Sequence, residues 1–479
     1  MDLDPLLLSR IQFAFVVSFH AIFPVFTIGL ASFIAVLEGL AFKTGSPVWR
    51  TLSGFWTKVF AVVFGMGVVS GIVMSFQFGT NWSNFAQASA NFLGPVLSYE
   101  VLTAFFLEAA FLGVLLFGRD KVPAGVHLLA AVMVATGTFI STFWILAANS
   151  WMQTPAGVVF QDGVFHVTSW ADALFNPSFP YRFGHMVMAS FLTGSFVVAG
   201  VSAWYLLRKR EVEANRKALS MCLWLILVLA PAQVLLGDAH GLNTLEHQPY
   251  KVAAMEGNWE TQSHVPLLLF ALPDRDTQSN HFEVGIPGMA SLILRHDFDG
   301  VVPGLRDIPV DEQPVVPVVF WSFRIMVAMG LLMVLFAVMG LVLRRNGRYW
   351  QTPWFLQGLR FMSIAPFIAV ETGWFVTETG RSPWLVYGMM TQAEAVTPSL
   401  TGGMALFTLI GYMVVYAAVF SAGLYYLMRV LYVGMEEREE EDYESDRPAR
   451  PLSAAHVPFE YGDDDSSDNH HKPAHQGGH

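Results

Sequence analysis

Nine long apolar segments restrict the fold of this chain more than any other feature of its sequence. Each is long enough to cross a hydrocarbon core of roughly 30 Å as a helix. The sequence therefore predicts an all-α, polytopic membrane protein with about nine transmembrane helices. The predicted spans are residues 11–42, 55–78, 93–117, 126–148, 183–207, 218–236, 318–343, 356–379 and 404–432.

The composition agrees with this class. Of 479 residues, 54% are hydrophobic and only 14% are charged, which is too apolar for an ordinary soluble domain. The chain has a single cysteine, Cys222, so an intrachain disulfide and a Cys-based metal or haem attachment motif are excluded. Any metal must be held by His, Met or carboxylate side chains.

The short basic loops set the orientation. Lys and Arg gather in alternate connections, which the positive-inside rule assigns to the cytoplasm. The N-terminus is then outside and the C-terminus in the cytoplasm. Asp2 and Asp4 precede the first span in place of a basic region, so we expect this span to be retained and not cleaved as a signal.

Four regions follow from this topology. Residues 1–236 hold spans one to six, residues 237–317 form a long extracytoplasmic loop, residues 318–432 hold spans seven to nine, and residues 433–479 form a cytoplasmic tail. A structureless loop of about 80 residues is more often functional than passive. From Glu436 the tail has 13 acidic residues against four basic ones, which predicts disorder and excludes nucleic acid as a partner.

Ionisable and metal-ligating residues gather at one depth of the predicted bundle. Counting inward along each span places five of them in the outer half of the membrane, next to the long loop. A sixth, Glu108, lies nearer the midplane. The five outer residues are His20, Glu100, His185, Met326 and Glu371.

Each of these residues also has a structural interpretation. A histidine in an apolar span is more often hydrogen-bonded in the core than a ligand, and most of the 21 methionines must serve packing. Buried carboxylates cost at least about 2.5 kcal/mol to insert, so they are functional candidates unless an arginine pairs with them. The candidate arginines are Arg182, Arg324 and Arg381, and Arg381 is a plausible partner for Glu378.

The chemistry of these side chains favours haem. A His and Met pair suits a six-coordinate electron-transfer haem, whereas a glutamate suits a five-coordinate iron that binds a small molecule. A chain of buried carboxylates can carry the protons that such a reaction consumes.

Several stretches are similar to subunit I of the cytochrome bd family of quinol oxidases. The resemblance runs in order from about residue 5 to 432 and leaves out the tail. It is carried by SRIQFAFVVSFHAIFPVFTIG, FQFGTNWSNF, LSYEVLTAFFLEAAF, KVAAMEGNWETQ, WSFRIMVAMG and FIAVETGWFVTETGRSPW.

The resemblance implies three haems in this subunit: a low-spin haem b, a high-spin haem b and a haem d, or a further haem b in its place. His185 and Met326 match the axial ligands of the low-spin haem. His20 and Glu371 match ligands of the two high-spin haems, and which haem each serves stays open. Further matches beside the haems are Glu100, Arg324 and Trp374.

The resemblance also implies the reaction. Lys251 and Glu256 match quinol-oxidation residues, and Glu108 matches a carboxylate on the proton route. Quinol would be oxidised at the outer face, and oxygen would be reduced to water with cytoplasmic protons, which generates a proton gradient. The implied setting is the lipid bilayer of the bacterial inner membrane, with a second subunit and a possible small accessory subunit.

Two alternatives remain at this point. The loop lacks the longest insertion of the family, and HGLNTLEHQPYK resembles the short-loop branch with cyanide-insensitive members. The identity of the third haem is therefore open. A proton-coupled transporter without haem is the alternative function, although the chain lacks the internal repeats typical of transporters.

Overall fold

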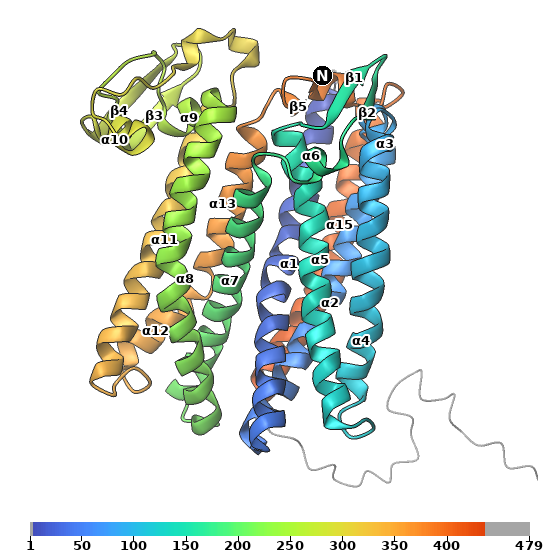
Figure 1. The fold of residues 1–479 in the computed structure, drawn as a ribbon, viewed down its shortest axis with the longest axis vertical. Coiled ribbons are helices and arrows are strands. Elements are labelled where there is room, and N and C mark those ends of the chain that lie inside the picture. The colour runs from blue at the N-terminus through green and yellow to red at the C-terminus, as the bar shows by residue number, and fades with distance from the viewer. Residues whose placement is uncertain (1–2, 436–479) are drawn as a thin grey trace, which may run out of the picture. The chain divides into compact units, whose positions relative to one another are not determined.

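The computed structural model describes residues 3–435, which form a bundle of long helices (Figure 1). The helices of the bundle are α1 (Pro5–Thr44), α2 (Pro47–Thr80), α3 (Ser83–Glu100), α4 (Phe106–Phe117), α5 (Ala124–Gln153), α7 (Phe179–Leu207), α8 (Val212–His247), α11 (Val316–Arg345), α12 (Pro353–Met362), α13 (Ala365–Thr379) and α15 (Gly402–Val433).

Within residues 3–435, nine helical segments are long and apolar enough to cross a membrane. Helices α3 and α4 make one of them, joined by a π-helical turn at Val101–Phe105, and α12 with α13 makes another. Every predicted span lies inside one of these segments, so the predicted all-α class is confirmed. The predicted tail lies, from residue 436 onward, outside the described residues.

Local sequence signals determine where the helices begin and end. Asp4 caps α1 by accepting a hydrogen bond from the backbone of Leu6 at 2.9 Å, and Pro5 occupies the first turn, where a missing N–H costs nothing. Gly45 ends α1 with φ of 65°, a left-handed conformation that glycine adopts without strain. Pro47 then starts α2, so two helices meet across a very short connection.

Helix α1 joins the two halves of the bundle, because it packs against α2 and α5 on one side and α7 on the other. At its crossing with α7, a methyl group on Gly29 would lie 2.2 Å from the carbonyl oxygen of Ser190. Gly194 faces the same point from α7. These small residues allow the close backbone approach typical of membrane helix pairs.

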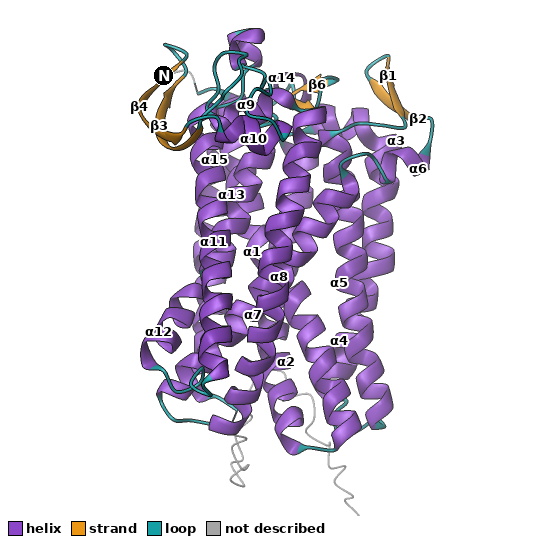
Figure 2. Ribbon diagram, turned by 60° about the vertical axis from the view of Figure 1, so that its left-hand side comes forward, coloured by secondary structure: helices purple, strands orange, loops and turns teal. Residues whose placement is uncertain are grey.

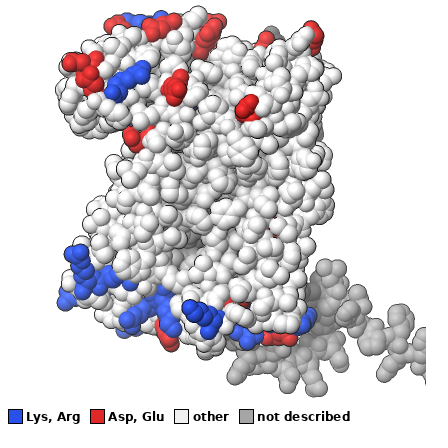
Figure 3. All heavy atoms as spheres, viewed as in Figure 1, with Lys and Arg blue, Asp and Glu red and all other residues white. Residues whose placement is uncertain are grey.

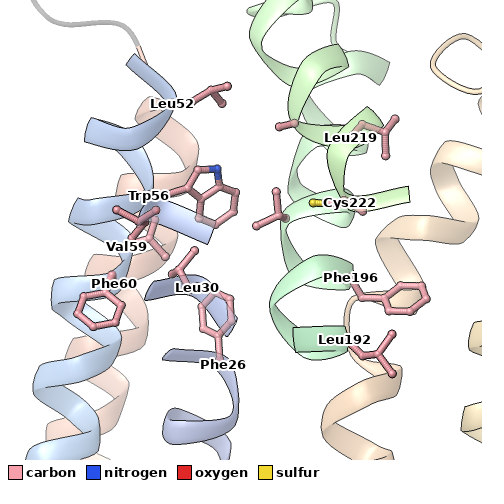
Figure 4. Close-up of a cluster of buried hydrophobic side chains, with 14 of the residues drawn as sticks. Phe26, Leu30, Leu52, Trp56, Val59, Phe60, Leu192, Phe196, Leu219 and Cys222 are labelled. Atoms are coloured by element: carbon pink, nitrogen blue, oxygen red, sulfur yellow. The ribbon is translucent and has the colours of Figure 1, made fainter. Parts of the chain in front are cut away.

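A large hydrophobic cluster fills the space around that crossing (Figure 4). Trp56 and Phe60 of α2 and Phe196 of α7 all belong to this cluster, and all three side chains are fully buried. Close packing replaces the hydrophobic effect as the main stabilising force between membrane helices, because lipid is as apolar as the core. The cluster fixes the relative positions of α1, α2, α7 and α8, which hold or adjoin most of the candidate residues.

The predicted loop at residues 237–317 is largely folded. Helix α8 continues past residue 236 to His247, and it stops there because Gln248 precedes Pro249 and adopts a non-helical conformation. Besides two 3-10 turns at Leu305–Asp307 and Val310–Glu312, the loop then forms two short helices and two strands before α11. They are α9 (Pro249–Glu256), an antiparallel hairpin of β3 (Leu267–Asp274) and β4 (Ser279–Ile286), and α10 (Met289–Arg295).

Smaller elements lie at the same end of the bundle as this loop (Figure 2). They are β1 (Val158–Gln161) paired with β2 (Val164–Val167), β5 (Trp384–Val386) paired with β6 (Met390–Thr391), and the short helices α6 (Trp170–Leu174) and α14 (Gln392–Ala395). Most Lys and Arg side chains visible in Figure 3 gather at the opposite end. We call the two ends the loop end and the basic end.

Candidate functional site

His20 on α1 is oriented by a hydrogen bond between its Nδ1 and the hydroxyl of Ser70 on α2, at 2.9 Å. That hydroxyl lies 2.9 Å from the carbonyl oxygen of Gly67, to which it donates. A hydroxyl has one proton, so Ser70 must accept from His20, which puts the ring proton on Nδ1. The lone pair on Nε2 is then available to a metal, the arrangement that ligating histidines commonly show.

His185 lies on α7 against α8. Its ring centroid is 5.5 Å from that of His240, and its backbone carbonyl accepts a hydrogen bond from the Gln233 side chain at 3.0 Å. The Nδ1 atom of His185 is buried and has no hydrogen-bond partner in the described chain. A buried ring nitrogen without a partner is unfavourable, so this atom fits a ligand.

Met326 on α11 faces α13. A methyl group on Gly373 would lie 3.1 Å from its sulfur, so the absence of a side chain there leaves the thioether room. Trp374, the next residue, is half-buried and packs against the cluster of Leu146, Ala147 and Phe179. Gly373 therefore lies against α11, and Trp374 lies against α5 and α7.

Two glutamates on α13 differ in their environment. Both carboxylate oxygens of Glu371 are buried and lack a hydrogen-bond partner in the described chain, and Ser18 of α1 lies beside them outside hydrogen-bond geometry. Glu378, in contrast, forms an ion pair with Arg381 and accepts a hydrogen bond from Asn149 at 2.9 Å. The expected pairing of Glu378 with Arg381 is confirmed, and Glu371 has no such partner.

Three buried basic side chains surround Glu378 at the loop end. Arg182 is 7% exposed, Lys251 3% and Arg381 3%, and the Nε atoms of both arginines lack a partner in the described chain. Lys251 donates to the side chain of Gln153 at 2.6 Å. Burial, and then the charges of Arg182 and Arg381, lower the pKa of Lys251 well below its usual value. The single carboxylate of Glu378 cannot balance the charges of Arg182 and Arg381. The cluster therefore fits an anionic ligand.

Glu256 ends α9 and forms a buried ion pair with Arg324 of α11, with 3.1 Å between Oε2 and Nη2. Arg324 also donates from Nε to the carbonyl of Leu268 at 2.8 Å and bonds to the carbonyl of Met255. Burial raises the pKa of Glu256 above its usual value, although Arg324 acts in the opposite direction. A carboxylate with a raised pKa is suited to accept a proton.

The π-helical turn aligns Glu100 with Glu108. In a regular α-helix, eight residues leave two side chains about 80° apart, and one wider π turn removes most of that offset. Both carboxylates therefore face α5. Ser141 donates to Glu100 at 2.8 Å, and one helical turn away a methyl group on Gly137 would lie 2.4 Å from Cγ of Glu108. Oε1 of Glu108 is buried without a partner in the described chain.

The contacts bring the predicted residues together in groups. Glu256 pairs with Arg324, and Lys251 belongs to the cluster around Glu378. Glu100 and Glu108 both point toward the same side of α5. Sequence reasoning missed Ser70, Gln153, Gly137 and His240. The first two are polar residues in or beside apolar spans, a signal that could have found them, whereas the role of Gly137 depends on which helix α4 meets.

Three comparisons with known proteins agree with this arrangement. The family profile described as "Cytochrome bd terminal oxidase subunit I" matches residues 8–435. A relative in Bacillus subtilis (strain 168), "Cytochrome bd ubiquinol oxidase subunit 1", is 34% identical over 92% of this chain and 96% of its own length. The "Cytochrome bd-II ubiquinol oxidase subunit 1" of Escherichia coli (strain K12) is 32% identical over 91% of this chain and 98% of its own.

A solved structure is also similar. "The structure of bd oxidase from Geobacillus thermodenitrificans" has a TM-score of 0.81 and 31% identity, and the match covers 90% of this chain and 100% of that one. The chain thus belongs to the cytochrome bd terminal oxidase subunit I family. It is a subunit of a terminal oxidase and a multi-pass protein of the bacterial inner membrane. The alternative of a haem-free transporter is set aside by this membership.

The tight fit between Gly137 and Glu108 gives a testable prediction. Gly137→Ala should displace the Glu108 side chain, because a methyl group there leaves no room for Cγ. We expect turnover of the purified complex to fall about tenfold, the equivalent of about 1.4 kcal/mol in the barrier. Haem content and the KM for quinol should not change.

Gly113→Ala is the matched control, since Gly113 also lies on α4 and a methyl group there meets nothing within 4 Å. Oxygen consumption and extracted haem are measured for both variants. Equal turnover in the two variants would show that the close contact at Gly137 is unimportant.

Proposed function

We propose that this subunit oxidises quinol at its loop end and contains the haem centre where oxygen is reduced to water. The observation that carries the proposal is a set of buried polar atoms without partners in the described chain, among them Nδ1 of His185 and both carboxylate oxygens of Glu371. The basic end would face the cytoplasm, as the concentration of Lys and Arg there supports (Figure 3). The N-terminus and the folded loop are then outside.

The residues fit the haem groups that the family implies. His185 and Met326 would be the axial ligands of the low-spin haem b, and His20 and Glu371 would each serve one of two further haems. The available Nε2 of His20 and the unpartnered Glu371 oxygens support the roles of these two residues. When bound, the haems supply electron transfer and oxygen reduction. The third would be haem d or a further haem b, and extraction of the haems from the purified complex distinguishes the two.

The buried cations fit the carboxylate groups of such cofactors. Arg182 and Arg381 carry more positive charge than Glu378 can balance. Haem propionates are anionic and would complete the missing hydrogen bonds of the two guanidinium groups. The cluster would thus orient the cofactor from the loop end, in addition to the axial ligands.

Quinol would bind at α9, which carries both Lys251 and Glu256. Glu256 would accept the proton of a quinol hydroxyl, and Arg324 would hold the carboxylate in place. Lys251 would stabilise the negative charge that develops on the quinol oxygen. Because both residues lie at the loop end, the released protons would leave on the outer side.

Protons for oxygen reduction would come from the basic end. Glu108 lies closer to that end than Glu100, and the two carboxylates share one face of α5. A proton would move from Glu108 to Glu100, where Ser141 holds the receiving group. Release outside and uptake from the cytoplasm would together generate a proton gradient.

The complex would contain a second membrane subunit, with a small accessory subunit as a further possible component. Ubiquinol and menaquinol both occur in the names of similar proteins, and either would suit the chemistry of Glu256 and Lys251. Assignment to the short-loop branch stays a prediction.

The two glutamates of α13 test the haem assignment. Glu371→Ala should remove about one haem in three, because the variant loses an axial ligand. Glu378→Ala should keep its haem but destabilise the protein by about 3–5 kcal/mol, because Arg381 would lose its buried partner. Haem per protein and thermal unfolding are measured on purified complexes. If Glu378→Ala lost haem and Glu371→Ala kept it, the ligand role would pass to Glu378.

The raised pKa of Glu256 predicts a pH dependence. Below that pKa the carboxyl group is protonated and cannot accept a proton from quinol, so the rate of quinol oxidation should rise as pH increases through it. Glu256→Gln should lose this acidic limb and oxidise quinol about 100-fold more slowly. All haems should be retained.

Arg324 is the only charged side chain that faces Glu256 in the described chain. No other titrating group should therefore alter the acidic limb of the pH–rate profile. Glu260→Gln is the control, since that carboxylate is exposed and pairs with Arg306 on the surface. A Glu256→Gln profile that kept the acidic limb would assign the proton acceptor to another group.

A further inference from the structure

The β3–β4 hairpin lies along the first turns of α11. Arg324 donates from Nε to the carbonyl of Leu268 at 2.8 Å, and the ring of Phe270 meets Trp321 edge to face with 5.2 Å between centroids. Leu268 also packs with Phe320 in a small buried cluster. One face of β3 is therefore fixed to the helix that begins the seventh span.

These contacts give the depth of the hairpin. About 20 residues of helix cross the hydrocarbon core. Leu343 precedes the basic Arg344 and is taken as the last residue of α11 in the core. About 20 residues counted back from Leu343 end at Arg324. The outer limit of the hydrocarbon core thus falls near Arg324, and the open end of the hairpin, where Leu267 pairs with Ile286, lies close to it.

The hairpin is apolar at that depth and polar farther out. Exposed apolar side chains include Leu269 at 55%, Val284 at 59% and Phe282 at 77%. The turn, in contrast, has the sequence Asp-Arg-Asp-Thr-Gln-Ser at residues 274–279. Its Arg275 bonds to the carbonyl of Gln313 at 3.4 Å, just before α11 begins. Polarity therefore changes along the hairpin in the direction of the membrane normal.

We infer that the apolar end of this hairpin is immersed in the outer leaflet, at the boundary between lipid headgroups and acyl chains. Its partner is phospholipid, because α11 also exposes apolar side chains near this depth, among them Ile325 and Val327. Large apolar patches are rarely left in water. Figure 1 shows the hairpin projecting sideways from the bundle beside α9 and α11, where lipid would surround it.

The immersed hairpin would also guide the substrate. Arg324 links Leu268 of the hairpin to Glu256, so the anchor holds the proton acceptor at the level of the membrane surface. A lipophilic quinol could then pass from the bilayer to Glu256 without crossing water. This second role rests on the proposed function, whereas the lipid contact itself does not.

Fluorescent labels test the lipid contact. In a Cys222→Ala background, which removes the one buried cysteine, Leu269→Cys and Val284→Cys are labelled with an environment-sensitive dye. The complete complex is placed in phosphatidylcholine vesicles with spin-labelled lipid. We expect lipid quenching at both positions and none at Asp276→Cys, an exposed turn residue.

Two outcomes would overturn the inference. Quenching by aqueous iodide at Leu269→Cys and Val284→Cys equal to that at Asp276→Cys would place the hairpin in water. Protection from both quenchers would mean that a protein partner covers it. Neither outcome depends on catalysis, so each is distinguishable from a failure of the proposed function.

Kinetics test the second role. The double variant Leu269→Ser with Val284→Ser should raise the KM for a long-chain quinol several-fold and leave the KM for a short-chain, water-soluble quinol unchanged. Maximal turnover and haem content should stay the same, and Asp276→Ser should behave as the unmodified protein. Equal KM changes for both quinols would contradict a role in access from lipid.

Discussion

The cost of burying charge in an apolar helix bundle governs the arrangement of this protein. Charges in such an environment are expensive unless partners neutralise them. Near the basic end the requirement is met, because Glu38 accepts hydrogen bonds from Arg119 and Ser53 and pairs with His127. At the loop end it is not met by the described chain, because Arg182, Arg381 and Glu371 keep polar atoms without partners. The contrast distinguishes a structural ion pair from a binding site.

The packing of the helices explains how those groups are held in place. Gly29 lets α1 approach α7 closely, and the cluster around Trp56 and Phe196 fixes both halves of the bundle. His20 and His185 lie on these two helices, so their separation is set by packing and not by a flexible loop. Rigid elements are the usual support for sites that require accurate geometry.

The sequence predicted the spans well, because nine apolar segments leave little choice of fold. It also predicted the pairing of Glu378 with Arg381, which lies three residues further along, just beyond the end of α13. It missed the folded hairpin, since β3 packs on α11 through contacts that are distant in the sequence. The alignment of Glu100 with Glu108 was equally hidden, because a π turn depends on local backbone geometry and the role of Gly137 on the neighbouring helix. Ligand assignments came from the family resemblance and stay proposals.

The most direct test of the account is a dithionite-reduced minus air-oxidised absorption spectrum of the purified complex, compared with that of Met326→Leu. We expect haem b bands in the unmodified complex. In the variant we expect the low-spin haem signal to be lost and the oxygen-site haem signal to remain, because one axial ligand is removed. A complex without haem, or a variant spectrum identical to that of the unmodified complex, would contradict the proposed site.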